Sequence, residues 1–84
     1  MNVSFTENAW EDYLYWQKTD RKIVRRINDL IKDIKRTPFE GLGKPEPLKY
    51  DLAGKWSRRI TEEHRLVYEV NGQHLIVYTC KYHY

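Results

Sequence analysis

The Asn71-Gly72 dipeptide constrains the fold of this chain more than any other feature, because Asn-Gly between apolar stretches signals a β-hairpin with a two-residue turn. Such a turn places Tyr68 opposite Leu75, and directly paired residues lie on the same face of a sheet. One face is then apolar and is predicted to contact the core; it carries Leu66, Tyr68, Val70, Leu75 and Val77. The other face is basic and aromatic; it carries Arg65, Val67, Ile76, Tyr78, Cys80 and Tyr82.

A strand over Lys55–Thr61 is predicted to precede this hairpin. If Trp56 of this strand faces the core, side-chain alternation places Arg59 on the opposite face, together with Arg65. We therefore expect the sheet to have an open face on which cationic side chains gather.

The first part of the chain has a helical period instead. Thr6 is a suitable N-cap for a helix over Glu7–Lys18. Asp20 is a suitable N-cap for a second helix over Arg21–Arg36, which Pro38 would stop. The second helix has an apolar stripe with i, i+3, i+4, i+7 spacing, formed by Ile23, Ile27, Leu30, Ile31 and Ile34. In the first helix the aromatic side chains are predicted to lie in the core, on a face formed by Trp10, Tyr13, Leu14 and Gln17.

The remaining segments complete the predicted fold. Asn2–Phe5 is predicted to form a short first strand, and Phe39–Pro47 a loop rich in Gly and Pro. The order of elements is then β-α-α-β-β-β, which indicates an α+β fold with a helical hairpin packed on one face of a mainly antiparallel sheet. A length of 84 residues allows one domain, so we expect residues 1–84 to form a single domain.

Two absences in the sequence bear on the location of the protein. The longest uncharged apolar run lies near Leu75–Cys80 and is far too short to span a bilayer. Met1–Phe5 lacks the basic start and the apolar stretch of a signal peptide. We therefore expect a cytoplasmic protein without a membrane partner.

Cys80 is the only cysteine of the chain, which excludes an intramolecular disulfide and a cysteine-based metal cluster. Because Cys80 lies within an apolar alternation, a buried small hydrophobic side chain is the favoured interpretation. A nucleophilic thiol would need a nearby base, and His83 is close in sequence.

Basic residues are concentrated in the predicted second helix, although the net charge of the chain is only +3. Residues 21–36 carry seven Lys or Arg side chains and two Asp side chains. A basic helix suits a polyanion such as a nucleic acid. Charged helix faces are usually only solvated, however, so the charge pattern alone leaves both interpretations open.

The C-terminal half contains the side-chain types that RNA cleavage needs, namely Glu46, Lys49, Arg58, Arg59, Arg65 and His83. In this reaction a base takes the proton of a 2′-hydroxyl group, an acid protonates the departing 5′-oxygen, and cations stabilise the charge on the phosphate. Glu and His can act as base and acid near neutral pH, and the planar Arg side chain matches phosphate oxygens. A single His is often structural, so the residue types alone do not decide the function.

Six stretches spread over nearly the full length form a more specific pattern. They are Asp12-Tyr13-Leu14-Tyr15-Trp16, Arg36-Thr37-Pro38-Phe39-Glu40-Gly41, Gly43-Lys44-Pro45-Glu46-Pro47-Leu48-Lys49, Trp56-Ser57-Arg58-Arg59-Ile60, Glu62-Glu63-His64-Arg65-Leu66-Val67-Tyr68 and Tyr82-His83-Tyr84. In these stretches and their order, the whole chain resembles the YoeB branch of the RelE/ParE toxin superfamily.

The resemblance implies the toxin of a type II toxin–antitoxin pair, with a RelE-like fold that is related to small microbial ribonucleases. Such toxins enter the ribosomal A site and cut the mRNA there by acid-base chemistry, so we expect neither a metal nor a cofactor. The resemblance also implies roles for six residues. Glu46 would be the general base and His83 the general acid, Arg65 would stabilise the scissile phosphate, Lys49 and Arg59 would bind phosphate, and Tyr84 would position His83 and the mRNA.

The same resemblance implies partners. They are a cognate YefM-like antitoxin, the bacterial ribosome with its mRNA, and a second copy of the chain in a homodimer. The basic second helix then becomes a candidate surface for ribosomal RNA, with phosphate contacts from Arg21, Lys22, Arg25, Arg26 and Arg36.

Three other functions remain open from the sequence. They are a ParE-type toxin that acts on DNA gyrase, a module that binds RNA or the ribosome without cutting, and a ribonuclease that acts on free RNA. One geometric difficulty also remains, because strict alternation places Tyr82 on the face of Arg65 but turns His83 away from it. Either the strand ends before His83, or a bulge or turn changes the direction of His83.

Overall fold

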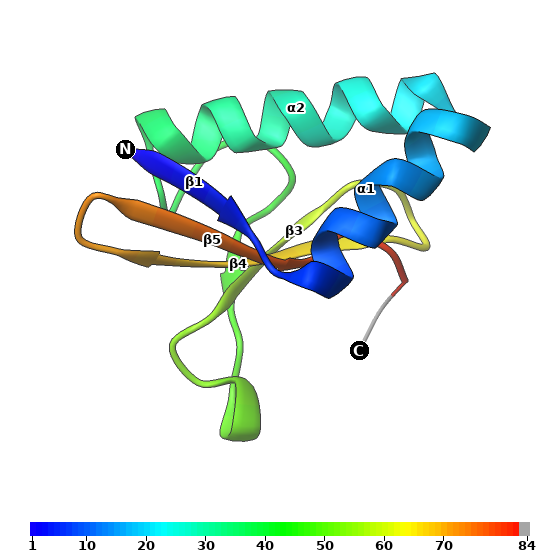
Figure 1. The fold of residues 1–84 in the computed structure, drawn as a ribbon. Helices are drawn as coiled ribbons and strands as arrows, with labels where there is room; N and C mark the ends of the chain where they lie inside the picture. The colour runs from blue at the N-terminus through cyan, green and yellow to red at the C-terminus, as the bar shows by residue number, and fades with distance from the viewer. Residues whose placement is uncertain (83–84) are drawn as a thin grey trace.

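The computed structural model describes residues 1–82, which form a five-stranded sheet with two α-helices on one of its faces (Figure 1). The strands are β1 (Asn2–Phe5), β2 (Glu46–Pro47), β3 (Trp56–Arg59), β4 (Arg65–Asn71) and β5 (His74–Thr79), in the spatial order β1-β5-β4-β3-β2. The helices are α1 (Glu7–Thr19) and α2 (Arg21–Arg36), and a short 3-10 helix, η1 (Tyr50–Leu52), follows β2.

This architecture confirms the predicted α+β fold. β1 pairs with β5 in parallel, and the other neighbouring strands are antiparallel. The prediction of a plain loop over Phe39–Pro47 was wrong at its end, because Glu46 and Pro47 pair with β3 as an additional short strand.

Asp20 links the two helices and caps both of them. Its N–H group donates to the carbonyl oxygen of Trp16 at the end of α1. Its carboxylate accepts hydrogen bonds at 3.0 and 3.4 Å from the N–H groups of Lys22 and Ile23, which satisfies two free donors at the start of α2. The predicted bounds of α2 are confirmed, and α1 is one residue longer than predicted.

The core lies between the helices and one face of the sheet. From the sheet it takes Leu66, Tyr68, Leu75 and Val77, all fully buried, and from α2 it takes Ile23, Ile27, Leu30 and Ile34. This confirms the predicted apolar stripe and the predicted apolar face of the hairpin. The prediction for α1 holds for Tyr13, which packs against the core, but it was wrong for Trp10 and Leu14, which are 48% and 38% exposed, while the helix buries Ala9 and Trp16. The indole N–H of Trp16 donates to the Cys80 carbonyl at 2.9 Å, and this tertiary contact decides which face of α1 turns inward.

The turn of the hairpin lies one residue later than predicted. Asn71 pairs with His74, so the two turn residues are Gly72 and Gln73, and Tyr68 pairs with Val77 rather than with Leu75. Gly72 has a φ of 62°, whereas Asn71 and Gln73 do not have positive φ values. A turn with positive φ at its first central residue alone is of type II′, while Asn-Gly at the two central positions would need positive φ at both. This shift in register gives the residues of β4 partners on β5 other than those predicted, but the same residues remain on the apolar face.

A β-bulge interrupts β5 near its end. Tyr68 pairs with Val77 but Val67 pairs with Thr79, so Tyr78 is an extra residue on β5. Alternation therefore changes phase, and Cys80 turns to the core, where it is fully buried. The predicted burial of Cys80 is confirmed, but the face assigned to it was wrong. The strand ends at Thr79, so both a bulge and a strand end precede His83, which lies outside the described residues.

Candidate functional site

The face of the sheet away from the helices brings together three of the predicted site residues. Glu46 pairs with Ser57, and Arg59 pairs with Arg65. Ser57 and Arg59 are two residues apart on β3, so all four side chains lie on this face, which we call the open face; Glu46 and Arg59 are exposed there, whereas Ser57 is buried. Residues in the diagonal relation of Glu46 to Arg59 are about 7–8 Å apart between Cα atoms. The open face therefore holds one carboxylate beside two guanidinium groups, from three adjacent strands.

The Arg59–Arg65 pair is unfavourable by itself, because like charges directly opposite each other in a sheet repel. Arg59 is exposed and Arg65 is half-buried. Nη1 of Arg65 donates to the carbonyl oxygens of Thr61 at 2.8 Å and Glu62 at 3.1 Å, so the connection between β3 and β4 holds this side chain in place. Two cationic residues at paired positions of neighbouring strands suit an anion that contacts both, and a phosphate group is such an anion.

Arg58, between Ser57 and Arg59, was grouped by residue type with the candidate catalytic side chains, but it is buried and organises the segment that leads to Glu46. Its side chain is fully buried. Its guanidinium donates to carbonyl oxygens of the 37–42 segment, namely those of Thr37 (2.7 Å), Glu40 (3.0 Å) and Leu42 (3.1 Å), and also to the Asp33 carboxylate (2.6 Å) and the Tyr68 hydroxyl (3.2 Å). All five N–H donors of the side chain are thus used, and the chain between α2 and β2 is fixed to the core.

Asp33 completes this buried arrangement. Its carboxylate accepts from the Leu42 N–H group at 2.9 Å, from Arg36 at 2.8 Å and from Arg58. These contacts, first that with the Leu42 N–H group, hold the pKa of Asp33 well below its usual range. The carboxylate is therefore charged whenever the protein is folded near neutral pH, and it balances the buried Arg58.

Gly43 allows the same segment to approach β3 closely. Its carbonyl accepts from the Arg59 N–H group at 2.7 Å. A Cβ atom on Gly43 would lie 2.9 Å from a methyl group of Leu30 and 3.0 Å from the Arg59 carbonyl oxygen, and the φ of 79° also favours glycine. The signals that could have indicated this anchor were an arginine at a core-facing position of β3 and the nearby glycines.

Lys49 lies in the exposed loop that follows β2, just before η1. A hydrogen bond of 2.9 Å from the Leu48 N–H group to the Lys55 carbonyl closes the base of this loop. Lys49 therefore follows Glu46 on the same short segment, with its ammonium group free to reach toward a bound anion.

Predicted site residues His83 and Tyr84 lie outside the described residues. The chain that leads to them ends beside the open face, because the Arg65 N–H group donates to the Tyr82 carbonyl at 3.2 Å. The predicted base, the two arginines that were predicted to bind phosphate and the last described residue thus belong to one region of the molecule.

The basic residues of α2 lie in the helix layer, on the other side of the sheet from the open face (Figure 1). Arg21, Lys22 and Arg25 are exposed. The other two predicted contacts also have internal partners, since Arg26 donates to the Arg59 carbonyl at 3.1 Å and Arg36 forms an ion pair with Asp33.

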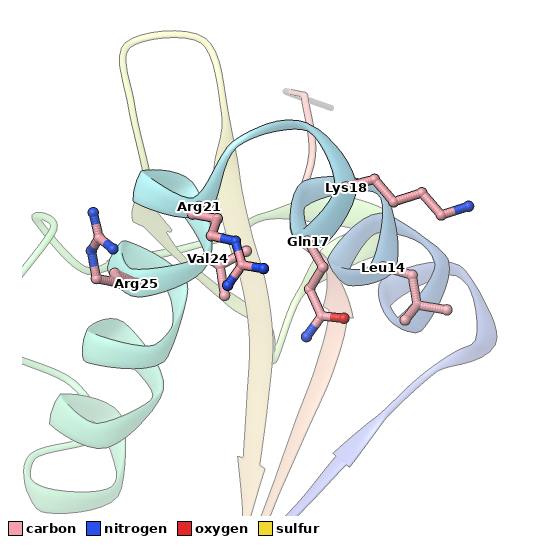
Figure 2. Close-up of a pocket in the computed structure, with 6 residues that line it drawn as sticks. All are labelled: Leu14, Gln17, Lys18, Arg21, Val24 and Arg25. Carbon is pink, nitrogen blue, oxygen red and sulfur yellow. The ribbon is translucent and has the colours of Figure 1, made fainter.

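An open cleft of about 490 Å³ separates the end of α1 from the start of α2. Figure 2 shows Gln17 and Arg21 projecting into this space, while Lys18 points away from it. Its apolar lining comes from Leu14 and Val24, and Arg25 completes it. The cleft has guanidinium groups at its edge, which agrees with the predicted preference of this surface for a polyanion.

The Cys80 thiol does not have the properties of a nucleophile. It is fully buried, and its sulfur lies 3.6 Å from the Ala9 carbonyl oxygen. Burial, together with the nearby Asp12 carboxylate, raises the pKa of the Cys80 thiol to about 12. The neutral thiol is thus the form present near neutral pH, as expected for a structural cysteine.

Two further observations concern residues 1–82 only. Within this part of the chain, no group of three or more His, Cys, Asp or Glu side chains is arranged to hold a metal ion. Neither of its α-helices combines the length and the apolar character that a membrane-spanning helix needs.

Comparison with known proteins agrees with this geometry. Residues 5–84 match the model of a family described as the YoeB-like toxin of bacterial type II toxin–antitoxin systems. Toxin YoeB of Escherichia coli strain K12 is 63% identical over 84 residues, covering 100% of both chains. A YoeB/ParE toxin structure from Agrobacterium tumefaciens is 58% identical with a TM-score of 0.96, again covering 100% of both chains.

Two structures from Staphylococcus aureus are also similar, and each comparison covers 100% of this chain and 98% of the other. One is a YoeB dimer, with 52% identity and a TM-score of 0.94. The other is a YoeB–YefM complex, with 50% identity and a TM-score of 0.93.

Proposed function

Because the chain belongs to the family of YoeB-like toxins of bacterial type II toxin–antitoxin systems, we propose that it is an endoribonuclease that cuts mRNA in the ribosomal A site and so inhibits translation. The observation that carries the proposal is the open face, which Glu46, Arg59 and Arg65 share on three adjacent strands. A carboxylate next to two cations is what acid-base cleavage of a phosphodiester needs at its centre.

In the proposed reaction the Glu46 carboxylate takes the proton of the 2′-hydroxyl group of the mRNA. The 2′-oxygen attacks the adjacent phosphorus, the bond from phosphorus to the 5′-oxygen breaks, and His83 donates a proton to that oxygen. The products are a 2′,3′-cyclic phosphate and a free 5′-hydroxyl group. Every proton is thus supplied by the chain or the substrate itself, and the mechanism requires no metal or cofactor.

The cations act on the charge that develops on phosphate in the transition state. Arg65 is held by the carbonyl oxygens of Thr61 and Glu62, so it is positioned before substrate arrives. Arg59 and Lys49 would bind the same phosphate or its neighbours, and Tyr84 would position His83 and the mRNA. The contacts of Arg58 support the assignment of Glu46 as the base, because they fix the segment that leads to this carboxylate.

Dependence on the ribosome follows from the exposure of the site. Glu46 and Arg59 are both exposed on the sheet surface rather than enclosed in a pocket that could hold a nucleotide. Such a site gains much from a substrate held in a fixed pose, which the ribosome provides for the A-site codon. The exposed Arg21, Lys22 and Arg25 on the helix layer would add sequence-independent contacts with ribosomal RNA.

The proposed partners follow from the relatives. Since similar YoeB chains occur in a complex with YefM and as a dimer, we propose a YefM-like antitoxin as the cognate partner and a homodimer as a second assembly. The site of action would be the cytoplasm, where the ribosomes are.

The test is mRNA cleavage by the purified protein, with and without programmed ribosomes, and with the cut mapped to the nucleotide. We expect a cut within the A-site codon only when ribosomes are present. His83→Gln should abolish the cut, whereas His74→Gln, the control at a histidine that bonds Ser4 at the other end of β5, should retain it. Translation that is still blocked without any cut would favour a binding module, poisoning of gyrase would favour a ParE-type toxin, and equal cleavage of free RNA would remove the ribosome from the mechanism.

A further inference from the structure

The last three described residues, Cys80–Tyr82, leave the sheet but remain tied to the protein by their backbone. The Cys80 N–H group donates to the Asp12 carboxylate at 3.0 Å, and the Cys80 carbonyl accepts from the indole N–H of Trp16 at 2.9 Å. Asp12 and Trp16 are both buried on α1. The first of the three residues is thus fixed by two side chains of the first helix.

Tyr82 is held in the same way by two consecutive residues, His64 just before β4 and Arg65 at its start. Its N–H group donates to Nδ1 of His64 at 2.7 Å, and its carbonyl accepts from the Arg65 N–H group at 3.2 Å. Tyr82 has a φ of 64°, a conformation that residues other than glycine seldom adopt. Both polar backbone groups of this unusual residue are therefore bonded, one of them to a side chain.

The His64 side chain is buried between Trp16 and Tyr82. It is only 8% exposed, and its ring packs against Trp16 with a centroid distance of 4.7 Å and against Tyr82 at 5.4 Å. Because a backbone N–H group can only donate, Nδ1 must accept, and the ring proton belongs on Nε2. The Glu63 carboxylate lies 3.7 Å from Nε2, where a negative charge favours that arrangement.

The family comparison and the open face give no role to His64, and we propose that it is a positioning residue for catalysis. By holding the Tyr82 N–H group, His64 fixes the residue that directly precedes His83 in the chain, and His83 is the general acid of the proposed function on which this inference rests. Since Arg65 is the next residue and holds the Tyr82 carbonyl, the same dipeptide ties the residue before the proposed acid to the arginine proposed to stabilise the phosphate. His64 itself does not touch the reacting atoms.

Two substitutions separate the hydrogen bond of His64 from its packing. The side-chain oxygen of Asn is separated from Cβ by the same number of covalent bonds as Nδ1 of His. The His64→Asn variant can therefore keep the hydrogen-bond acceptor while it loses the ring. Leu fills much of the ring volume, so His64→Leu keeps apolar packing but has no acceptor. His74→Leu is the matched control, because His74 is a half-buried histidine that bonds Ser4 on the neighbouring strand.

The experiment measures kcat and KM for cleavage of mRNA on programmed ribosomes with these variants. A general acid that is displaced by about 1 Å can cost on the order of 10²-fold in rate. We expect His64→Leu to lower kcat by about that factor with little change in KM, which is the pattern of an interaction needed only in the transition state. His64→Asn should retain most of the wild-type kcat, and His74→Leu all of it.

A wild-type kcat in His64→Leu, or an equal loss in the Leu and Asn variants, would overturn the proposal, because the acceptor would then not matter. A second measurement on the wild-type protein does not depend on the folding of any variant. Its nitrogen NMR spectrum should show His64 protonated at Nε2 alone, with slow exchange of the Tyr82 amide proton. A proton on Nδ1 would contradict the bond on which the inference rests. Inactive wild-type protein would instead refute the proposed function, and the NMR result would still test the contact.

Discussion

Replacing Arg58 by Met should destabilise this protein far more than the same change at its neighbour Arg59. Arg58 is fully buried and donates five hydrogen bonds, whereas Arg59 is exposed on the other face of β3. The two variants make the same chemical change one residue apart. Their comparison therefore isolates the effect of burial and bonding.

The size of the effect can be worked from the contacts. A hydrogen bond with a charged partner contributes roughly 1.5–3 kcal/mol, but the loop carbonyls of Glu40 and Leu42 belong to exposed residues and regain water when Arg58 is lost. Removal of one partner from a buried, bonded charge pair costs about 3–5 kcal/mol, and we adopt that range. For a domain of this size, a loss of about 4 kcal/mol lowers Tm by roughly 16–32 °C. Arg59→Met should change stability by less than about 0.5 kcal/mol.

The assay is thermal unfolding followed by circular dichroism, with urea unfolding as a second measure of the free energy of unfolding. Similar Tm values for the two variants would refute the reasoning, since Arg58 would then not anchor the 37–42 segment. A folded Arg58→Met protein at low temperature should also cleave more slowly than wild type, because the segment that leads to Glu46 has lost its attachment to the core.

Four further outcomes are expected. Glu46→Gln should lower kcat on programmed ribosomes by about 10²–10⁴-fold with little loss of ribosome binding, and an equal loss of both would indicate a binding role. Changing both Lys22 and Arg25 to Gln should weaken ribosome binding and flatten its dependence on salt, as measured by sedimentation at several ionic strengths. Cys80 should resist iodoacetamide at pH 8 in the native protein and react once urea unfolds it, because its pKa is about 12 in the folded state. The pKa of Asp33 is lower in the folded than in the unfolded state, so its stabilising effect is present above pH 3.8 and is lost as pH falls further; Asp33→Asn should therefore show a shallower acid dependence in urea titrations.

The local elements of this fold were predictable from the sequence because each has a local cause. Asp20 supplies the cap of α2, the isoleucines supply its buried face, and Pro38 follows its end, so the bounds Arg21–Arg36 were predicted correctly. Alternation along β3 and β4 likewise placed Arg59 and Arg65 on one face, and the structure pairs them directly.

Other features had no local signal. The sequence allowed a type I′ or a type II′ turn at the end of this hairpin, and the pairing of Asn71 with His74 selected the type II′ turn. Which face of α1 turns to the core depended on which tryptophan forms a tertiary hydrogen bond. The indole N–H of Trp16 donates to the Cys80 carbonyl, 64 residues away. The bulge at Tyr78 changes alternation by one residue, and nothing in the order of residues 74–82 indicates where it must occur.

The candidate site shows the same division. Residue type sets charge and acidity, so the order of residues indicated which side chains could carry the chemistry. Period and caps act over a few residues, so the two helices and a cationic face of the sheet were also predictable. Three arrangements depend on the packed fold instead: Glu46 pairs with β3 beside Arg59, Arg58 is the buried anchor of the preceding segment, and His64 holds Tyr82, the residue before His83. Those arrangements join residues 11 to 21 positions apart along the chain, and such contacts form only when the whole core is packed.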